Sequence, residues 1–259
     1  MKFKNFKYVL TILMLFVYIN FFPFISRVSA ANPSHNVIYN IFNKASGKCL
    51  NVNFGTDANG TNVTQYTQDG SVEQRFKLKT NLRNSFNIHP ICSSSGKVLD
   101  ILRVNGSANG AIASGCNVDI WSSGDNDAQD FVFQSEGGGY FSIHPRAATH
   151  LAITTNGTGN GSGAGTSPEA TGNVYVSTYT GANNQLWYFQ ETTARCYYYN
   201  FNVYNEFTNS NLNSLIPDIG YNYVGLVNKS NSQFSEDIRN SQIFIYVGHG
   251  ANSGSELLR

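Results

Sequence analysis

The chain has 259 residues, of which 13% are charged, and its formal net charge at pH 7 is +1. Nucleic-acid binding relies on clustered Lys and Arg, and a chain this poor in charge does not supply them. Asn, Gly, Ser and Thr dominate the polar residues, and aromatic residues make up 14%. Neutral hydrogen-bonding groups with aromatic faces suit a hydroxyl-rich ligand such as a sugar, although the same composition is typical of any loop-rich β protein.

The first 30 residues have the features of a secretory signal peptide. Three lysines within the first seven residues precede an almost uncharged apolar stretch, residues 8–25, and small residues follow at 28–30. This order is the one that signal peptidase reads, so we expect cleavage after Ala30 and a secreted protein. The alternative is a retained anchor, since the stretch approaches the ~20 residues that span a bilayer. Pro23 and the small residues favour cleavage, and membrane contact is expected only through an uncleaved segment.

Residues 34–192 contain one pattern that is repeated three times. Each copy opens on a short strand, continues into a second apolar segment, and ends on Gln-x-aromatic. The three closing motifs are Gln74-Arg75-Phe76, Gln129-Asp130-Phe131 and Gln185-Leu186-Trp187. A fixed period of roughly 50 residues indicates a supersecondary unit that cannot bury its apolar face alone. Three copies are therefore expected to close around one core.

The same span predicts an all-β fold. Short strands alternate with clusters of Gly and Asn, which favour turns, and no helical periodicity of useful length is present. Short strands at regular spacing indicate a sandwich or a barrel, and the threefold repeat favours a β-trefoil. We expect the aromatic residue of each closing motif to point into the core and each motif Gln to hydrogen-bond the backbone of the turn.

With Ser46-Gly47-Lys48-Cys49-Leu50 and the three Gln-x-aromatic motifs, residues 38–190 resemble the ricin-B-type lectin β-trefoil. The resemblance implies one shallow sugar site per repeat and a carbohydrate or glycoconjugate as partner. In such a site an acid directly after the strand Leu accepts hydrogen bonds from sugar hydroxyls. An aromatic platform stacks on the C–H face of the sugar, and a polar residue lies beside the motif Gln.

On this resemblance the second repeat carries the most complete sugar site. Asp100 directly follows Leu99, Trp121 takes the platform position, Asp119 lies two residues before it, and Gln129 lies at the motif end. The alternative roles are a turn-capping Asp100 and a Trp121 that is partly buried in the core.

The other two repeats keep less of the site. In the first, Asn51 replaces the acid and Tyr66 is the platform, so it is a weaker sugar site. In the third, Ala152 and Ser177 occupy the two key places, so this copy is expected to be structural.

No cofactor or metal site is predicted. His89 and His144 occupy equivalent places before Pro, which suits a role in the turns. The four cysteines have no zinc-like spacing, and their connectivity cannot be read from sequence alone. Cys92 and Cys116 belong to the same repeat, which favours them as a disulfide pair.

Residues 195–259 predict the start of an α/β sheet. Strands are expected at 197–204, 223–227 and 243–247, with helical segments at 211–219 and 235–239. The last strand runs into Gly248-His249-Gly250, and catalytic residues favour the C-terminal ends of such strands.

This C-terminal segment resembles the opening of a caspase-like cysteine peptidase, in which His249 matches the general base. No cysteine is placed to act with His249, so we expect the sequence given to lack peptidase activity. Two readings therefore compete: a secreted carbohydrate-binding protein, and the N-terminal fragment of a secreted peptidase that its lectin domain targets. A third is a trefoil used for protein contacts, since one fold hosts many functions.

Overall fold

The computed structural model describes residues 32–107, 109–124, 126–161, 163, 165–198, 220–227 and 243–247. The predicted signal peptide, both helical segments of the C-terminal part and His249 lie outside these residues. Within the described part of the chain, no helix has the length and apolar character needed to cross a membrane.

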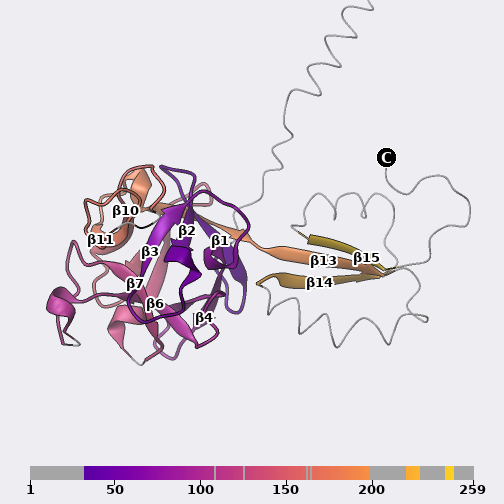
Figure 1. Ribbon diagram of the computed structural model, residues 1–259, viewed down its shortest axis with the longest axis horizontal. Helices are drawn as coiled ribbons and strands as arrows, with labels where there is room; N and C mark the ends of the chain where they lie inside the picture. The colour runs from indigo at the N-terminus through magenta and orange to yellow at the C-terminus, as the bar shows by residue number, and fades with distance from the viewer. Residues whose placement is uncertain are drawn as a thin grey trace, which may run out of the picture.

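Six strands form a closed antiparallel barrel (Figure 1). Each strand pairs with the next around the ring, and the last pairs with the first from Tyr39 opposite Glu191 to Asn43 opposite Trp187. In ring order the strands are β1 (Ile38–Asn43), β4 (Phe76–Thr80), β5 (Phe86–Pro90), β8 (Phe131–Ser135), β9 (Phe141–Pro145) and β12 (Leu186–Glu191).

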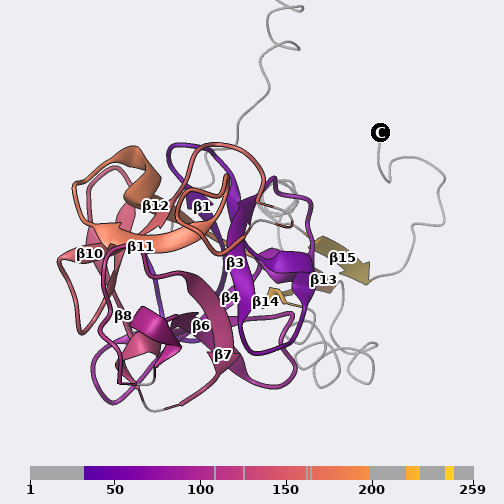
Figure 2. The same cartoon turned by 60° about the vertical axis from the view of Figure 1, so that its left-hand side comes forward.

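Three hairpins complete the fold, one in each repeat (Figure 2). They pair β2 (Cys49–Val52) with β3 (Thr61–Tyr66), β6 (Lys97–Ile101) with β7 (Val118–Ser122), and β10 (Leu151–Thr155) with β11 (Val174–Thr178). Short 3₁₀ turns lie between the strands: η1 (Asn53–Gly55), η2 (Val72–Gln74), η3 (Val104–Gly106), η4 (Asp127–Gln129) and η5 (Asn183–Gln185). A six-stranded barrel with three hairpins in threefold order is a β-trefoil, so the predicted all-β fold is confirmed.

The closing motifs have the two roles that the sequence predicts. Phe76, Phe131 and Trp187 are completely buried in the core. Each motif Gln donates from Nε2 to the carbonyl seven residues earlier and accepts at Oε1 from the backbone N–H five residues earlier. The carbonyls belong to Thr67, Ser122 and Thr178, and the N–H groups to Asp69, Gly124 and Thr180.

The three hairpins meet in a ring of buried asparagines. Asn117 donates to Asn62 at 2.8 Å, Asn62 donates to Asn173 at 2.9 Å, and Asn173 donates back to Asn117 at 2.9 Å. All three side chains are buried, so each amide depends on its neighbours in the ring for these hydrogen bonds.

The C-terminal strands form a separate three-stranded parallel sheet in the order β14 (Asn222–Val227), β13 (Thr193–Tyr198), β15 (Ile243–Val247) (Figure 1). The first strand begins at Thr193 rather than at residue 197, because the chain leaves β12 at Glu191 and pairs again almost at once. Cys196 consequently lies within this sheet, opposite Ile245, whereas the predicted strand at 197–204 leaves it outside.

This small sheet is fixed to the barrel by polar contacts. The side chain of Asn222 accepts from the backbone N–H of Ile38 at 2.9 Å and donates to its carbonyl at 2.9 Å. The Arg75 guanidinium lies 4.0 Å from the ring centre of Tyr221. The C-terminal strands therefore start from a defined place on the trefoil.

The predicted disulfide between Cys92 and Cys116 is wrong, because both residues are free cysteines. Cys116 is buried in the core, and Cys92 packs against that core from its edge. Burial raises the pKa of Cys92 to about 12. Both side chains therefore act as small apolar groups that fill the core.

Replacing Trp187 by Ala tests the role of the buried aromatic residues. The change removes a completely buried ring and the hydrogen bond from its Nε1 to the carbonyl of Ile153. We expect the free energy of unfolding to fall by about 3–5 kcal/mol, the usual cost of such a cavity. Chemical denaturation provides the measurement, with Leu82→Ala at a fully exposed position as control. A loss no larger than that of the control would contradict this core assignment.

Replacing Asn173 by Ala tests the asparagine ring. The Oδ1 of Asn117 loses the N–H that donates to it, and the Nδ2 of Asn62 loses the oxygen that accepts from it. Each buried polar group left unsatisfied costs about 1–3 kcal/mol. We expect a loss of roughly 2–5 kcal/mol in the free energy of unfolding, and double variants of two ring residues should lose less than the sum of the single changes. Additive losses would show that the ring residues contribute independently.

Candidate functional site

The hairpin of β6 and β7 brings the acids and the aromatic residue of the second repeat together. Asp100 lies directly opposite Asp119, and Val98 lies opposite Trp121. Residues two apart on a strand point to the same face, so Asp100, Asp119 and Trp121 share one face of the hairpin.

A depression of about 240 Å³ lies on this face. Trp121 is 44% exposed at its wall and belongs neither to the core cluster nor to the partly buried residues packed against it. The polar residues of the lining are Asp100, Arg103, Ser107 and Asn126, and the others are Ile101, Leu102, Gly106, Trp121 and Ala128. An exposed indole beside a carboxylate and an amide can stack on an apolar ligand face and hydrogen-bond its hydroxyl groups.

The two acids of the hairpin differ in their surroundings. Asp119 is only 3% exposed, and its Oδ1 has no hydrogen-bond partner among the described residues. Burial, together with the charge of Asp100, raises the pKa of Asp119 to about 8. Burial also raises the pKa of Asp100, but a hydrogen bond from the Gln129 side chain and the charge of Arg103 oppose this rise.

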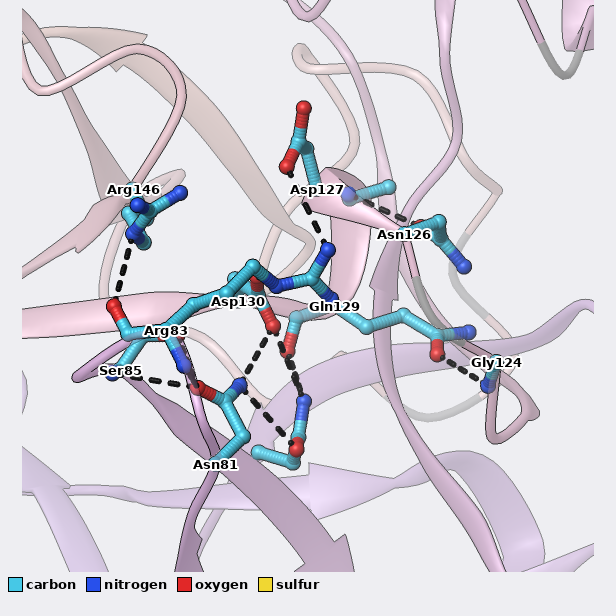
Figure 3. A network of polar contacts seen from close by, with 11 residues as sticks. Asn81, Arg83, Ser85, Gly124, Asn126, Asp127, Gln129, Asp130 and Arg146 are labelled. Atoms are coloured by element: carbon cyan, nitrogen blue, oxygen red, sulfur yellow. Dashed lines mark hydrogen bonds and ion pairs between the residues drawn. The ribbon is translucent and has the colours of Figure 1, made fainter.

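Gln129 and Asp119 are not among the residues that line the depression. Figure 3 shows the Gln129 side chain directed at the N–H of Gly124, where the two atoms are 2.8 Å apart. Its Nε2 donates to the carbonyl of Ser122, the residue that follows Trp121. Gln129 therefore holds the turn beside the platform, and its side chain also hydrogen-bonds Asp100.

An ion pair between Arg83, in the turn between β4 and β5, and the buried Asp130 supports the same wall (Figure 3). The Nε of Arg83 lies 2.7 Å from Oδ2 of Asp130, whose side chain is completely buried, and Asn81 donates to the other oxygen at 2.7 Å. At the start of η4, Asn126 accepts from the backbone N–H of Ala128. The wall that carries Asn126 and Ala128 is thus held by a buried polar network.

The first repeat has a smaller depression of about 170 Å³, lined by Asn51, Asn53, Phe54, Tyr66, Asp69 and Glu73. Its Asn51 is buried, and the Nδ2 atom donates to the carbonyl of Val52 at 3.1 Å. Phe54 is 74% exposed and has a φ of 55°, which is unusual for a bulky residue. Asn51 and Tyr66, the two residues predicted for a sugar site in this repeat, line the same depression. The sequence pattern did not single out the aromatic face of Phe54.

In the third repeat the structure shifts the predicted register. Gln185 donates to Oγ1 of Thr154 at 3.2 Å, just as Gln129 contacts Asp100. Thr154, not Ala152, therefore occupies the acid position, because Ile153 rather than Leu151 takes the place of Leu99. Ser177 does occupy the platform position, and its Oγ lies 2.7 Å from that of Thr154. The third repeat has neither an acid nor an aromatic residue at these two places.

The two histidines before proline have structural surroundings. His144 is buried, with Nδ1 2.6 Å from the carbonyl of Leu151 and Nε2 2.7 Å from Oγ of Ser142. Burial, with the charges of Lys79 and Lys77, lowers the pKa of His89 to about 4. Among the described residues, no three His, Cys, Asp or Glu side chains gather as a metal site would require.

Sequence reasoning missed Arg103 and Asn126, which line the second-repeat depression. A signal for Asn126 was present, since Asn directly before Asp-Ala-Gln is typical of the cap of a short helical turn. Arg103 stands two residues after the end of β6, and nothing in its local pattern separates it from a surface arginine.

Comparison with known protein families gives a match over the first repeat and part of the second. Residues 27–114 match the family model described as "Ricin-type beta-trefoil lectin domain-like". A search of curated proteins gives no match.

Solved structures similar to this chain include the Rhizoctonia solani agglutinin, at 18% identity and a TM-score of 0.49, covering 62% of this chain and 99% of that one. A Macrolepiota procera ricin B-like lectin in complex with lactose has 14% identity and a TM-score of 0.44, covering 62% and 99%. A mosquitocidal holotoxin has 17% identity and a TM-score of 0.51, covering 62% of this chain and 18% of its own. At this identity the last likeness shows a shared fold.

Proposed function

We propose that the protein is a carbohydrate-binding protein whose best site is the second-repeat depression. The observation that carries the proposal is the exposed indole of Trp121 on the same hairpin face as Asp100. A sugar stacked on Trp121 would present its hydroxyl groups to Asp100 and Asn126, which both line the depression. The family match of residues 27–114 supports the same class of ligand.

The first-repeat depression is proposed as a second and weaker sugar site. Tyr66 and Phe54 offer aromatic faces there, but Asn51 supplies an amide in place of the carboxylate. Hydrogen bonds to charged groups contribute more than those between neutral groups, so this site should contribute less affinity than the second.

Export is proposed from the sequence of the first 30 residues, with the mature chain beginning after Ala30. Sequencing the N-terminus of the exported protein tests this. A mature N-terminus at residue 31 supports cleavage, and an intact Met1 in a membrane fraction would support the retained anchor.

The alternative function is a secreted cysteine peptidase whose trefoil directs it to its target, with His249 as general base. One observation favours it: β13, β14 and β15 are parallel strands, and the last ends at Val247, two residues before His249 in the sequence. Reading the gene past Arg259 discriminates between the two functions, because the peptidase needs a further strand that ends in a nucleophilic Cys.

Sugar binding should depend on Asp100 and Trp121. Each change to Ala should weaken binding roughly tenfold to a hundredfold, since a hydrogen bond to a charged group contributes about 1.5–3 kcal/mol and a stacked ring a comparable amount. The strongest ligand on an array of neutral glycans is titrated by calorimetry against both variants. Glu191→Ala is the control, because Glu191 is an exposed acid that does not line the depression. Unchanged affinity in both variants would place the site elsewhere.

The sequence given should show no peptidase activity that depends on His249. Cys196 lies inside the central strand of the parallel sheet and pairs in register with Ile245, which is four residues before His249 in the sequence. A peptidase needs a thiolate within hydrogen-bond reach of the base, and in the caspase-like family that this segment resembles that thiolate follows a further strand. A thiol-reactive peptide inhibitor should label no cysteine in a His249-dependent manner. Labelling of Cys196 that disappears in His249→Ala would favour the peptidase.

A further inference from the structure

We propose that Asp119 is the proton-carrying partner of Asp100, and that the two carboxyl groups hold one proton between them when the second-repeat site binds its ligand. The inference rests on the proposed sugar site for its functional meaning. The shared proton itself is a property of the hairpin and can be measured without a ligand.

The geometry of the hairpin forces the two groups together. Asp100 and Asp119 are direct cross-strand partners of antiparallel strands, and such partners have Cβ atoms about 4.5–5.5 Å apart. Two ionised carboxylates in this arrangement repel one another. Two acids held this close characteristically retain one proton between them.

The surroundings decide which carboxyl group keeps the proton. Asp119 is almost completely buried, and its Oδ1 has no hydrogen-bond partner among the described residues. Its register partner on β3 is the neutral Asn62. The charge of Asp100 disfavours ionisation of Asp119. The hydrogen bond from Gln129 and the positive charge of Arg103 both favour the ionised form of Asp100. Asp100 is therefore the ionised member and Asp119 the neutral one.

The other two repeats support a neutral group at this place. The residue ten before the motif Gln is Asp119 in the second repeat, Thr64 in the first and Tyr175 in the third. Thr64 and Tyr175 lie opposite Asn51 and Thr154 in the same hairpin register. A protonated Asp119 thus has the charge state of its equivalents.

Ligand binding should depend on this proton. A sugar that covers the depression takes water away from the acid pair, and loss of water disfavours the charged form. The ligand therefore binds the singly ionised pair better than the doubly ionised pair. Because burial raises the pKa of Asp119 to about 8, affinity should fall as the pH rises through that value.

The sign for stability follows from the same shift. The pKa of Asp119 is higher in the folded protein than in the unfolded chain, so from about pH 4 to pH 8 the folded state retains a proton that the unfolded state has released. Stability from this group is therefore lost as the pH rises across this window and levels off above it. One retained proton corresponds to about a tenfold change in the unfolding constant per pH unit.

The test compares the full chain with Asp119→Asn, which keeps a neutral side chain of the same size. Thermal and denaturant unfolding are followed from pH 5 to pH 9, with Glu191→Gln as an exposed control. The unfolding constant of wild type divided by that of Asp119→Asn should increase roughly tenfold per pH unit up to about pH 8. The same ratio for the control should not change with pH. Asp119→Thr, which copies the first repeat, replaces Asp119→Asn if the latter does not fold.

Binding is read on the array of neutral glycans at pH 6 and pH 9 with the same proteins. Wild type should lose signal at pH 9, and Asp119→Asn should bind alike at both pH values. A difference in stability between wild type and Asp119→Asn that does not change with pH would overturn the shared proton. Equal pH dependence of binding in wild type and Asp119→Asn would overturn its role in the site. An array without signal at either pH would contradict the proposed function, while the unfolding data still decide the proton.

Discussion

The ring of Asn62, Asn117 and Asn173 is the constraint on which the positions of the other groups depend. Each amide donates to one neighbour and accepts from the other, so the ring closes only when all three hairpins approach the axis in the same register. A slip by one residue would turn every side chain to the opposite face and leave buried amides without partners. The ring thereby also fixes the residue two positions later, which in the second repeat is Asp119.

The motif glutamines fix the other end of the same strands. Gln129 binds the carbonyl of Ser122, directly after Trp121, while the asparagine ring holds Asn117 near the start of β7. Asp119 and Trp121 lie between these two points. The platform and the acid pair are therefore placed by hydrogen bonds that touch no ligand, and a rigid frame of this kind is what a shallow binding site requires.

The sequence predicts the barrel well because its evidence is periodic: Gln-x-aromatic recurs, and buried aromatic residues have few other places to lie. It predicts the third repeat poorly, because Leu151 resembles Leu99 but stands two residues away from its equivalent. A better marker was present in the recurring Asn-Val pairs at 62, 117 and 173, each twelve residues before its motif Gln. The free Cys92 and the buried state of Asp119 depend on three-dimensional distances and solvent exposure that local patterns do not contain.

The three repeats share one frame and differ in what they place in it, and that difference separates stability from function. Thr64 and Tyr175 show that the position of Asp119 accepts neutral residues without loss of the fold. Two acids opposite one another, one with an unsatisfied buried oxygen, are less favourable for folding than a Thr or a Tyr at the position of Asp119. A residue that lowers the stability of the fold, at a position where the other repeats carry residues that do not, is typical of a functional site. The second hairpin is therefore the place where the structure departs from its own most stable pattern, and it does so beside the exposed Trp121.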